Sequence, residues 1–352
     1  MRKYLLLAAM IIAAGVAGAQ QKYNIYFGTT HSHNNFSGDI VKSHAAKGIP
    51  LDPKNEVDQC IIAARDNGFQ FYCVTDHSQY ECYTQDAWTT VGKWADKLTE
   101  DGKFVALRGF EYSRNDDTDG KGHMNVYNTP NYVSAALDAY DLHMFQDWLM
   151  LPENSGAIVG FNHPGKGGYN NFAIYNPASK SKFALLEVVN GANPKYYDRF
   201  VEVLALGFKV SPVAGLDNHN YQAIPKAISR TGVAATELTR KGVLEAFAAR
   251  RTYATLDKEL KVFYTVNGKP MGSTLTKPKG DLKFAVDAST PNTISKIEVK
   301  GEGGNTITSK DFTSGDVKWA VSVPQGQKYY FLIVYEQGAE APVAWIAPVW
   351  VE

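Results

Sequence analysis

The sequence predicts an α/β fold followed by a separate unit built from β-strands. Up to about residue 255, short apolar runs alternate with amphipathic helical stretches, which is typical of βα units that form a parallel sheet or barrel. From about Lys261, strand-like runs follow one another without helices and are joined by turn-rich connections such as Asn267-Gly268 and Gln325-Gly326. The chain has 352 residues, 44% of them hydrophobic, so it can bury a sizeable core.

The predicted elements of the first part follow one another in a regular order. Strands are expected at 23–27, 69–74, 104–107, 157–161, 184–189 and 210–214, with a further short strand opening near residue 122. A helix opens at Asp52-Pro53 and stops at Asn67-Gly68, because its apolar residues share one face and glycine is a common C-terminal stop. Further helices are expected near 137–151, 196–206 and 238–250.

The second part is predicted to be a small β-sandwich. Its strand-like runs cover Phe263, 282–286, 297–299, 319–323 and 329–335. We place the α/β unit at 22–258 and the sandwich at 262–352. The sandwich is expected to pack on the barrel, because 252–262 contains no stretch rich in Gly, Ser or Pro. Trp345 and Trp350 are expected in its core, with a sugar-binding platform as the alternative.

The first residues resemble a secretory signal peptide. Arg2 and Lys3 precede an apolar run at 5–16, which is followed by Ala17-Gly18-Ala19. We therefore assign 1–19 as a signal and expect a periplasmic or extracellular protein. A membrane anchor is the alternative, but the run is shorter than the roughly 18–20 residues that cross a bilayer, and no later segment is long and apolar enough.

Charge and cysteine content exclude several classes of protein. Lys plus Arg and Asp plus Glu both number 36, so there is no basic excess and no nucleic-acid partner is expected. The three cysteines, Cys60, Cys73 and Cys82, form no CxxC pair, which argues against a disulfide framework and a thiolate zinc site. Cys60 and Cys73 are expected to be small buried hydrophobic residues.

Six of the eight histidines stand at the ends of predicted strands, where barrel folds place their active sites. They are His31, His33, His77, His123, His163 and His219, and the same ends carry Asp39, Glu111 and Asp217. His31 and His33 project to one side because residues two apart in extended backbone do so. Nitrogen and oxygen ligands suit Zn, Mn or Fe, and nine exceed the needs of one ion.

These residues therefore predict two or three divalent metal ions, with at least one pair bridged by a carboxylate. The alternative is a set of hydrogen-bonded core histidines and capping aspartates. His44 and His143 are not assigned to the site.

The motifs HxH, TDH, Glu, His, HP and DxH occur in the order that resembles the polymerase and histidinol phosphatase (PHP) superfamily, over about 23–255. Three further segments resemble its DUF3604-type branch: Arg250-Arg251-Thr252-Tyr253-Ala254-Thr255, Met271-Gly272-Ser273 and Ala344-Trp345-Ile346-Ala347-Pro348-Val349-Trp350. The resemblance implies a distorted seven-stranded (β/α) barrel with a trinuclear metal centre that hydrolyses phosphoesters. It also implies that the nucleophile is a metal-bound water and that no protein nucleophile is needed.

The resemblance further assigns the ligands. A first metal would take His31, His33, Glu111 and Asp217; Glu111 would bridge to a second, held by His123 and His163; Asp39, His77 and His219 would hold a third. Thr29-Thr30 precede His31 where the family commonly has Asp-Leu, so the support of His31 is expected to differ. Asp76 is expected to orient His77 or a neighbour.

The substrate is expected to be a small anionic phosphoester, with Arg114, Lys166 and Arg230 as candidates for binding its phosphate. Nucleotides, sugar phosphates and phosphodiesters all fit this pattern, because specificity depends on loops such as 78–86, 115–121 and 166–177. Two other classes stay open: a metal-dependent amidohydrolase, which also begins with HxH, and a secreted binding protein on the same scaffold. No feature of the sequence indicates an oligomeric state.

Overall fold

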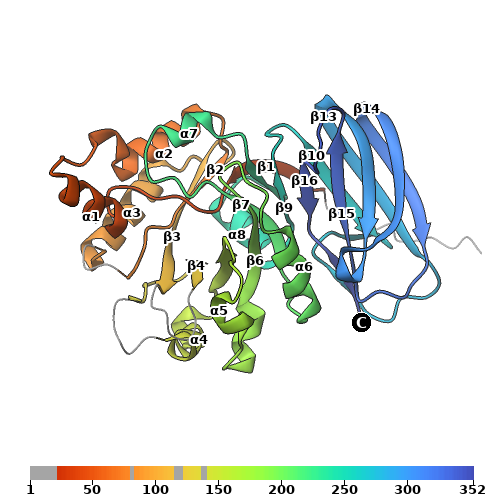
Figure 1. Cartoon of the computed structure of the whole chain (residues 1–352), viewed down its shortest axis with the longest axis horizontal. Coiled ribbons are helices and arrows are strands. Elements are labelled where there is room, and N and C mark those ends of the chain that lie inside the picture. Colours follow the sequence, from red (N-terminus) through yellow and green to blue (C-terminus); the bar gives the residue numbers. More distant parts are fainter. Residues whose placement is uncertain (1–21, 80–82, 115–121, 136–140) are drawn as a thin grey trace, which may run out of the picture.

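A computed structural model describes residues 22–79, 83–114, 122–135 and 141–352. The predicted signal peptide, Cys82 and the loop 115–121 lie outside these residues. The described chain is a mixed α/β structure in which a helix-covered curved sheet adjoins a large β unit (Figure 1). The prediction of an α/β fold is confirmed at this level.

The curved sheet differs from an all-parallel barrel in its strand directions. Its strands, in spatial order, are β9 (Thr252–Thr255), β8 (Arg230–Ala235), β1 (Asn24–Thr29), β2 (Phe71–Val74), β3 (Val105–Arg114), β4 (Gly122–Tyr127), β5 (Ile158–Asn162), β6 (Phe183–Asn190) and β7 (Ser211–Gly215). The sets β1–β3 and β5–β7 are parallel. β4 runs antiparallel between them, and β8 and β9 are also antiparallel to their neighbours.

Side chains join β7 to the other edge of the curved sheet, so the sheet returns on itself. The hydroxyl of Thr231 in β8 donates to the carbonyl of Ala214 at 2.8 Å and accepts from its N–H at 2.7 Å. Thr252 in β9 donates in the same way to the carbonyl of Pro212. Beyond β7, the N–H of Leu216 donates to the carbonyl of His31, which brings the ends of β7 and β1 together.

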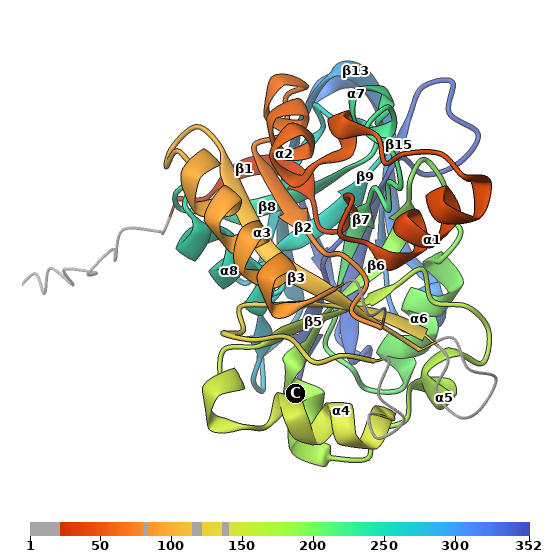
Figure 2. The same cartoon turned by 90° about the vertical axis from the view of Figure 1, so that its left-hand side faces the viewer.

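Helices cover the outside of the curved sheet (Figure 2). They are α1 (Gly38–Lys47), α2 (Val57–Asp66), α3 (Gln85–Leu98), α4 (Leu142–Leu149), α5 (Gly168–Phe172), α6 (Tyr197–Ala205), α7 (Ala223–Lys226) and α8 (Arg240–Ala248), with 3₁₀ turns at Pro53–Asn55, Pro152–Asn154, Pro177–Lys182 and Glu302–Gly304. Side-chain caps fix the first turns of α3, α4 and α8. The side chains of Thr84, Asp141 and Thr239 accept hydrogen bonds from the backbone N–H groups of Ala87, Met144 and Gly242, respectively. No helix is expected from the sequence at the position of α3, although Trp88, Val91 and Ala95 bury one of its faces.

The β unit contains β10 (Lys261–Val266), β11 (Lys269–Pro270), β12 (Thr274–Leu275), β13 (Leu282–Lys300), β14 (Thr306–Val323), β15 (Tyr329–Glu336), β16 (Ala344–Ile346) and β17 (Val349–Val351). The long strand β13 pairs with β14 along its length, with β10 through its first half and with β15 through its second. The change of partner coincides with a register shift between Ser289 and Ile294. β13 therefore links the two halves of the unit.

The β unit and the curved sheet share strand pairing and core. β16 pairs with β9, with Trp345 opposite Ala254. One hydrophobic cluster contains Phe200 of α6 together with Phe331, Trp345 and Trp350 of the β unit. Both tryptophans are buried as expected, and their cluster extends under the curved sheet to residues such as Phe161 and Leu186. This contact agrees with the expectation that the two parts pack together.

The described residues also bear on the cysteines and on membrane insertion. Cys60 and Cys73 are buried free thiols, as predicted. None of the helices in the described ranges is both long and apolar enough to cross a membrane.

Candidate metal centre

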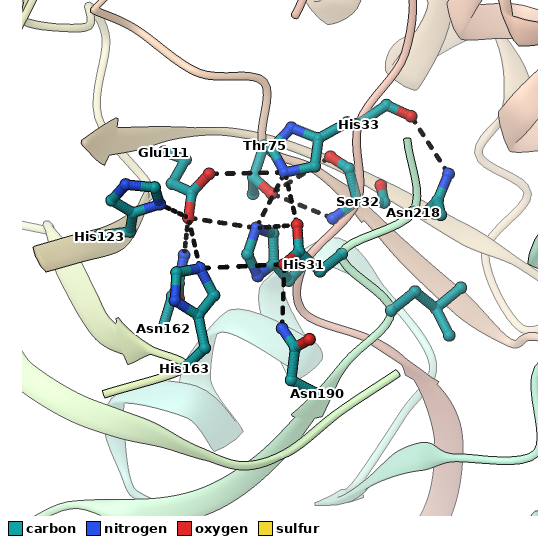
Figure 3. A network of polar contacts seen from close by, with 12 residues as sticks. His31, Ser32, His33, Thr75, Glu111, His123, Asn162, His163, Asn190 and Asn218 are labelled. Carbon is teal, nitrogen blue, oxygen red and sulfur yellow. Dashed lines mark hydrogen bonds and ion pairs between the residues drawn. The ribbon is translucent and has the colours of Figure 1, made fainter. Parts of the chain in front are cut away.

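Six of the nine candidate ligands follow the ends of β1, β2, β5 and β7: His31, His33, His77, His163, Asp217 and His219. Glu111 lies within β3, His123 near the start of β4 and Asp39 in the first turn of α1. Figure 3 shows five of these side chains, those of His31, His33, Glu111, His123 and His163, pointing toward one another. His31 and His33 follow β1 and point the same way, with their Nε2 atoms 3.1 Å apart. Both imidazoles are fully buried, whereas His219 on the opposite rim is 40% exposed. The cluster therefore has a buried floor and an open side.

Glu111 of β3 is the centre of this cluster. Its carboxylate is fully buried and lies within 3.5 Å of ring nitrogens on five histidines: His31 (3.3 Å), His33 (3.4 Å), His77 (2.8 Å), His123 (3.2 Å) and His163 (3.5 Å). Asp217 adds a second carboxylate, 3.0 Å from His33 Nε2. Asp39 of α1 adds a third, 2.5 Å from His219 Nε2 and 3.8 Å from His77 Nε2.

The ligand atoms form four overlapping groups, each within 4.8 Å, that could hold an ion. They are His31 with His33 and Asp217, His31 with Glu111 and His163, His77 with Glu111 and His123, and His33 with His77 and His219. Three residues of the expected first set, His31, His33 and Asp217, form one of these groups, and Glu111 shares His31 with it. His77 belongs to two groups, one with Glu111 and one with His219.

The electrostatics keep the carboxylates ionised. Burial acts to raise the pKa of Asp217, but the neighbouring charges of His31 and His33 outweigh it and hold this pKa well below its usual range. Burial also opposes charge on His31, whose pKa is nevertheless raised by Glu111, Asp217 and Glu187. Burial, reinforced by His77, lowers the pKa of His33 to about 3. Ionised carboxylates and a neutral imidazole are the forms that bind metal.

Two buried oxygens support the presence of cations at this site. Glu111 Oε2 and Asp39 Oδ1 are buried without a hydrogen-bond donor in the described structure, although imidazole nitrogens approach both carboxylates. A buried unsatisfied carboxylate oxygen is costly unless an ion or another donor meets it. Together with nitrogen donors from six histidines, this set fits divalent transition metals.

Glu187 of β6 orients the floor of the site and was missed by the sequence analysis. Its Oε1 accepts from His31 Nδ1 at 2.7 Å, which directs His31 Nε2 into the cluster. Its Oε2 accepts from the backbone N–H of His163 at 2.7 Å. The signal was available, because Glu187 is a single charge within the apolar run 184–189. Glu187 therefore supports the side chain of His31, while Thr29 Oγ1 lies 3.1 Å from the carbonyl of His31.

Other polar residues hold the remaining ligands in place. Ser37 Oγ lies 3.0 Å from His33 Nδ1, and Ser113 Oγ lies 2.8 Å from His77 Nδ1. Asn162 donates to Glu111 Oε1 at 2.8 Å, and Asn190 to Asp217 Oδ2 at 3.1 Å (Figure 3). Asp76 accepts from Asn34 N and Nδ2, so its hydrogen bonds fix the residue next to His33.

Two of the candidate ligands have strained backbone conformations. His163 and Asp217 have φ values of +31° and +50°, in the region that non-glycine residues rarely adopt. Such strain persists where the surroundings determine it, and it gathers at functional sites.

The three candidates for binding phosphate have different surroundings. Lys166 is exposed and lines a hollow beside His123 and His163. Arg230 is 3% exposed, donates to the carbonyls of Ala227 and Ser229, and lies 3.5 Å from the centre of the Phe69 ring. Its guanidinium is committed to these partners, so we do not retain it as a substrate contact. The side chain of Arg114 lies outside the described structure.

The two unassigned histidines stand apart from this cluster in their contacts. His44 Nδ1 lies 2.8 Å from the carbonyl of Pro50, and His143 lies 3.9 Å from Asp147 within α4.

Part of the chain is similar to one protein family, and most of it to proteins from two bacteria. The family described as "Protein of unknown function (DUF3604)" matches residues 44–147. Two uncharacterized proteins, from Chlamydia pneumoniae and Chlamydia trachomatis, are 23% and 22% identical to this chain over 86% of its length. The alignment covers 55% of each relative, so the chain spans about half the length of the curated relatives it matches.

Solved structures resemble the chain more distantly. A two-domain protein of Bacteroides vulgatus, described as containing a predicted PHP-like metal-dependent phosphoesterase, aligns with 94% of this chain and 100% of its own at 16% identity and a TM-score of 0.46. A lesion-specific endonuclease of Pyrococcus furiosus aligns with 64% of this chain and 56% of its own at 12% identity and a TM-score of 0.40.

Proposed function

We propose that this chain is a metal-dependent hydrolase of phosphoesters, of PHP type, with a di- or trinuclear centre. The observation that carries the proposal is the position of Glu111, a buried carboxylate surrounded by five imidazoles and retaining an oxygen without a hydrogen-bond donor. The nine ligands would be His31, His33, Asp39, His77, Glu111, His123, His163, Asp217 and His219. When bound, Zn, Mn or Fe ions would supply Lewis acidity that activates water and neutralises phosphoryl charge.

The residues of the chain prepare this chemistry by holding charge and orientation. The carboxylate of Glu187 accepts a hydrogen bond from the Nδ1–H of His31. The other ring nitrogen, Nε2, therefore presents its lone pair to the cluster. The open side carries His219, Asp39, His123 and His163, which leaves a route for an anionic substrate. Ser37 and Ser113 lie beside imidazoles but are at most 1% exposed, so neither is placed to attack a substrate. This supports water as the nucleophile.

The proposal extends to the unit boundaries and the location of the protein. We infer a metal-binding barrel over 22–258, closed by side chains at the β7 seam, and a β-sandwich over 262–352. We also infer that residues 1–19 direct export, which would place the enzyme in the periplasm or outside the cell.

Elemental analysis combined with a substrate panel tests the proposed function. We expect two or three transition-metal ions per chain and metal-dependent hydrolysis of a phosphomonoester or diester, lost on chelation. The panel should include sugar phosphates, nucleotides, a DNA oligonucleotide, amides and lactones. His31→Ala, His77→Ala and His219→Ala should each abolish turnover, with His44→Ala as the matched control. One ion or fewer per chain, or cleavage of amides or lactones alone, would contradict the proposal.

A further inference from the structure

A hollow of about 340 Å³ opens beside the imidazoles of His123 and His163. Its other walls are Asn162, Lys166, the ring of Tyr169 and a run of glycines. Asn162 also donates to Glu111, so one residue belongs to both the hollow and the metal cluster. A group bound in this hollow would therefore lie next to a phosphoryl group bound at the cluster, so the two could belong to one substrate molecule.

Lys166 stands at the tip of a tight turn, which we call the lysine turn (Gly165–Gly168). Gly168 N donates to Gly165 O at 3.3 Å, and Gly167 has φ +76° and ψ −1°. Those angles are those of the third residue of a type II turn, where glycine is required. Lys166 occupies the second position, and within the described structure its ammonium has no carboxylate partner. The backbone N–H groups of Lys166 and Gly167 are also without described acceptors.

The lysine turn is held in place by the strained segment that follows it. Tyr169, Asn170, Asn171 and Phe172 all have positive φ, between +50° and +60°. A left-handed conformation is unfavourable for non-glycine residues, so tertiary contacts must maintain it. The buried hydroxyl of Tyr169 lies 2.6 Å from the carbonyl of Asn162 and 2.8 Å from that of His123. Gly122 permits this approach, because a Cβ there would meet the Tyr169 ring at 2.5 Å.

The size and charge of the hollow restrict its ligand. A volume of about 340 Å³ is near the lower limit of small-molecule pockets, roughly 300–1,000 Å³, which favours a compact group over an extended polymer. Lys166 supplies one positive charge to the wall of the hollow, and the N–H groups of Lys166 and Gly167 are donors without a described acceptor. A group with one negative charge and two acceptor oxygens, such as a carboxylate, is the chemical match for these donors. Asn162, the glycine backbone and the imidazole edges favour a polar, hydroxyl-bearing body.

We propose that this hollow binds the leaving group of the substrate and that Lys166, with the N–H groups of the lysine turn, binds a carboxylate on it. The substrate class is then the phosphate ester of a small sugar acid. This inference rests on the proposed function, since it assumes that the ester phosphorus lies at the metal cluster. Lys166 is thereby assigned to specificity for the leaving group, not to the transferred phosphoryl group.

Binding of the two dephosphorylated products tests the hollow without depending on turnover. Gluconate and sorbitol share a six-carbon polyol chain and differ in a terminal carboxylate. By calorimetry on the metal-loaded protein, wild type should bind gluconate about tenfold more tightly than sorbitol, as expected for one charge-assisted contact. Lys166→Met should remove this preference, Lys166→Arg should retain most of it, and Lys279→Met, an exposed lysine before β13, should leave it unchanged. Equal binding by wild type, or a preference that survives Lys166→Met, would overturn the proposal.

Initial rates then separate this inference from the proposed function. The kcat/KM for 6-phosphogluconate should exceed that for sorbitol 6-phosphate about tenfold, and Lys166→Met should bring the ratio near one by slowing only the former. An equal loss on both substrates would show that Lys166 binds the phosphoryl group and would overturn the proposal. Absence of hydrolysis with a Lys166-dependent preference for gluconate would contradict the phosphoesterase and support the hollow.

Discussion

The end of the proposed barrel that carries the candidate metal ligands and the C-terminal β unit bury different kinds of side chain. The first region buries His31, His33, Asp76, Glu111 and Glu187, each at most 1% exposed. In the fully described stretch 257–352, the buried polar side chains are Thr265 and Glu298, and the rest of the buried set is apolar. One region holds charge in a low-dielectric environment, and the other removes apolar surface from water.

This difference indicates that the two regions contribute differently to stability and to function. Ionised groups held close together without water raise the free energy of the folded state unless counter-charges meet them. In the stretch 257–352 the buried carboxylate is Glu298, which Lys296 and Lys300 each meet at 2.9 Å. The apolar core of the β unit joins that of the proposed barrel through Phe200, Phe331 and Trp345. We infer that the β unit stabilises a barrel whose open end is arranged for chemistry.

Replacing Glu111 with Gln should have the largest effect. A neutral amide cannot bridge two cations, so kcat/KM should fall more than about a thousandfold, since even a residue that supports a ligand contributes about 10- to 100-fold. Metal content per chain should fall with it. Elemental analysis and initial rates measure both, with circular dichroism to confirm folding. Retention of metal and activity would show that Glu111 is not the centre of the site.

Phe331→Ala tests whether the β unit stabilises the barrel. Phe331 is fully buried and its ring contacts Phe200 edge-to-face at 5.5 Å. The free energy of unfolding should fall by about 3–5 kcal/mol, the usual result of removing a buried phenyl ring. Denaturant unfolding should retain one transition for both parts. Phe312→Ala, at a partly buried ring, is the control, and a separate, unshifted barrel transition would contradict the coupling.

Glu187→Gln should have an intermediate effect on the site. The amide keeps the shape of the side chain but loses the charge that faces His31 Nδ1 at 2.7 Å. We expect metal affinity or turnover to fall about 10- to 100-fold, with the fold retained. Competition with a chelator of known affinity measures this change. A loss as large as that of Glu111→Gln would place Glu187 among the ligands.

The smallest expected effect is on the pH dependence of stability, and it comes from the carboxyl pair Asp257 and Glu336 outside the site. Burial, reinforced by the adjacent Asp257, raises the pKa of Glu336 from 4.5 to about 7. The folded state then binds more protons than the unfolded state between these values, so the free energy of unfolding should decrease as pH rises from 4.5 to 7. Glu336→Gln should remove this part of the pH dependence. Denaturant midpoints for wild type and variant across pH 4–8 would show it, and parallel profiles would contradict it.

The alternation of apolar periodicity and the histidine positions predicted much of this protein from sequence alone. Period-two strands, helix stops such as Asn67-Gly68 and histidines at strand ends are local patterns, and local backbone geometry determines where such residues point. The α/β class and the gathering of the candidate ligands could therefore be predicted. The helix α3 was missed although Thr84 and Trp88 carried its signal.

Only the tertiary structure decided what depends on distant segments meeting. The pairing of Glu187 with His31 joins residues 156 positions apart. The burial of Arg230 against Phe69 depends on the approach of the segment between α2 and β2 to the start of β8. The antiparallel direction of β4 depends on its pairing with β3 and β5. The left-handed backbone of Tyr169 and Phe172 likewise depends on packing, because aromatic residues rarely adopt it. Residue types determined which chemistry is available, and long-range packing determined which groups face one another.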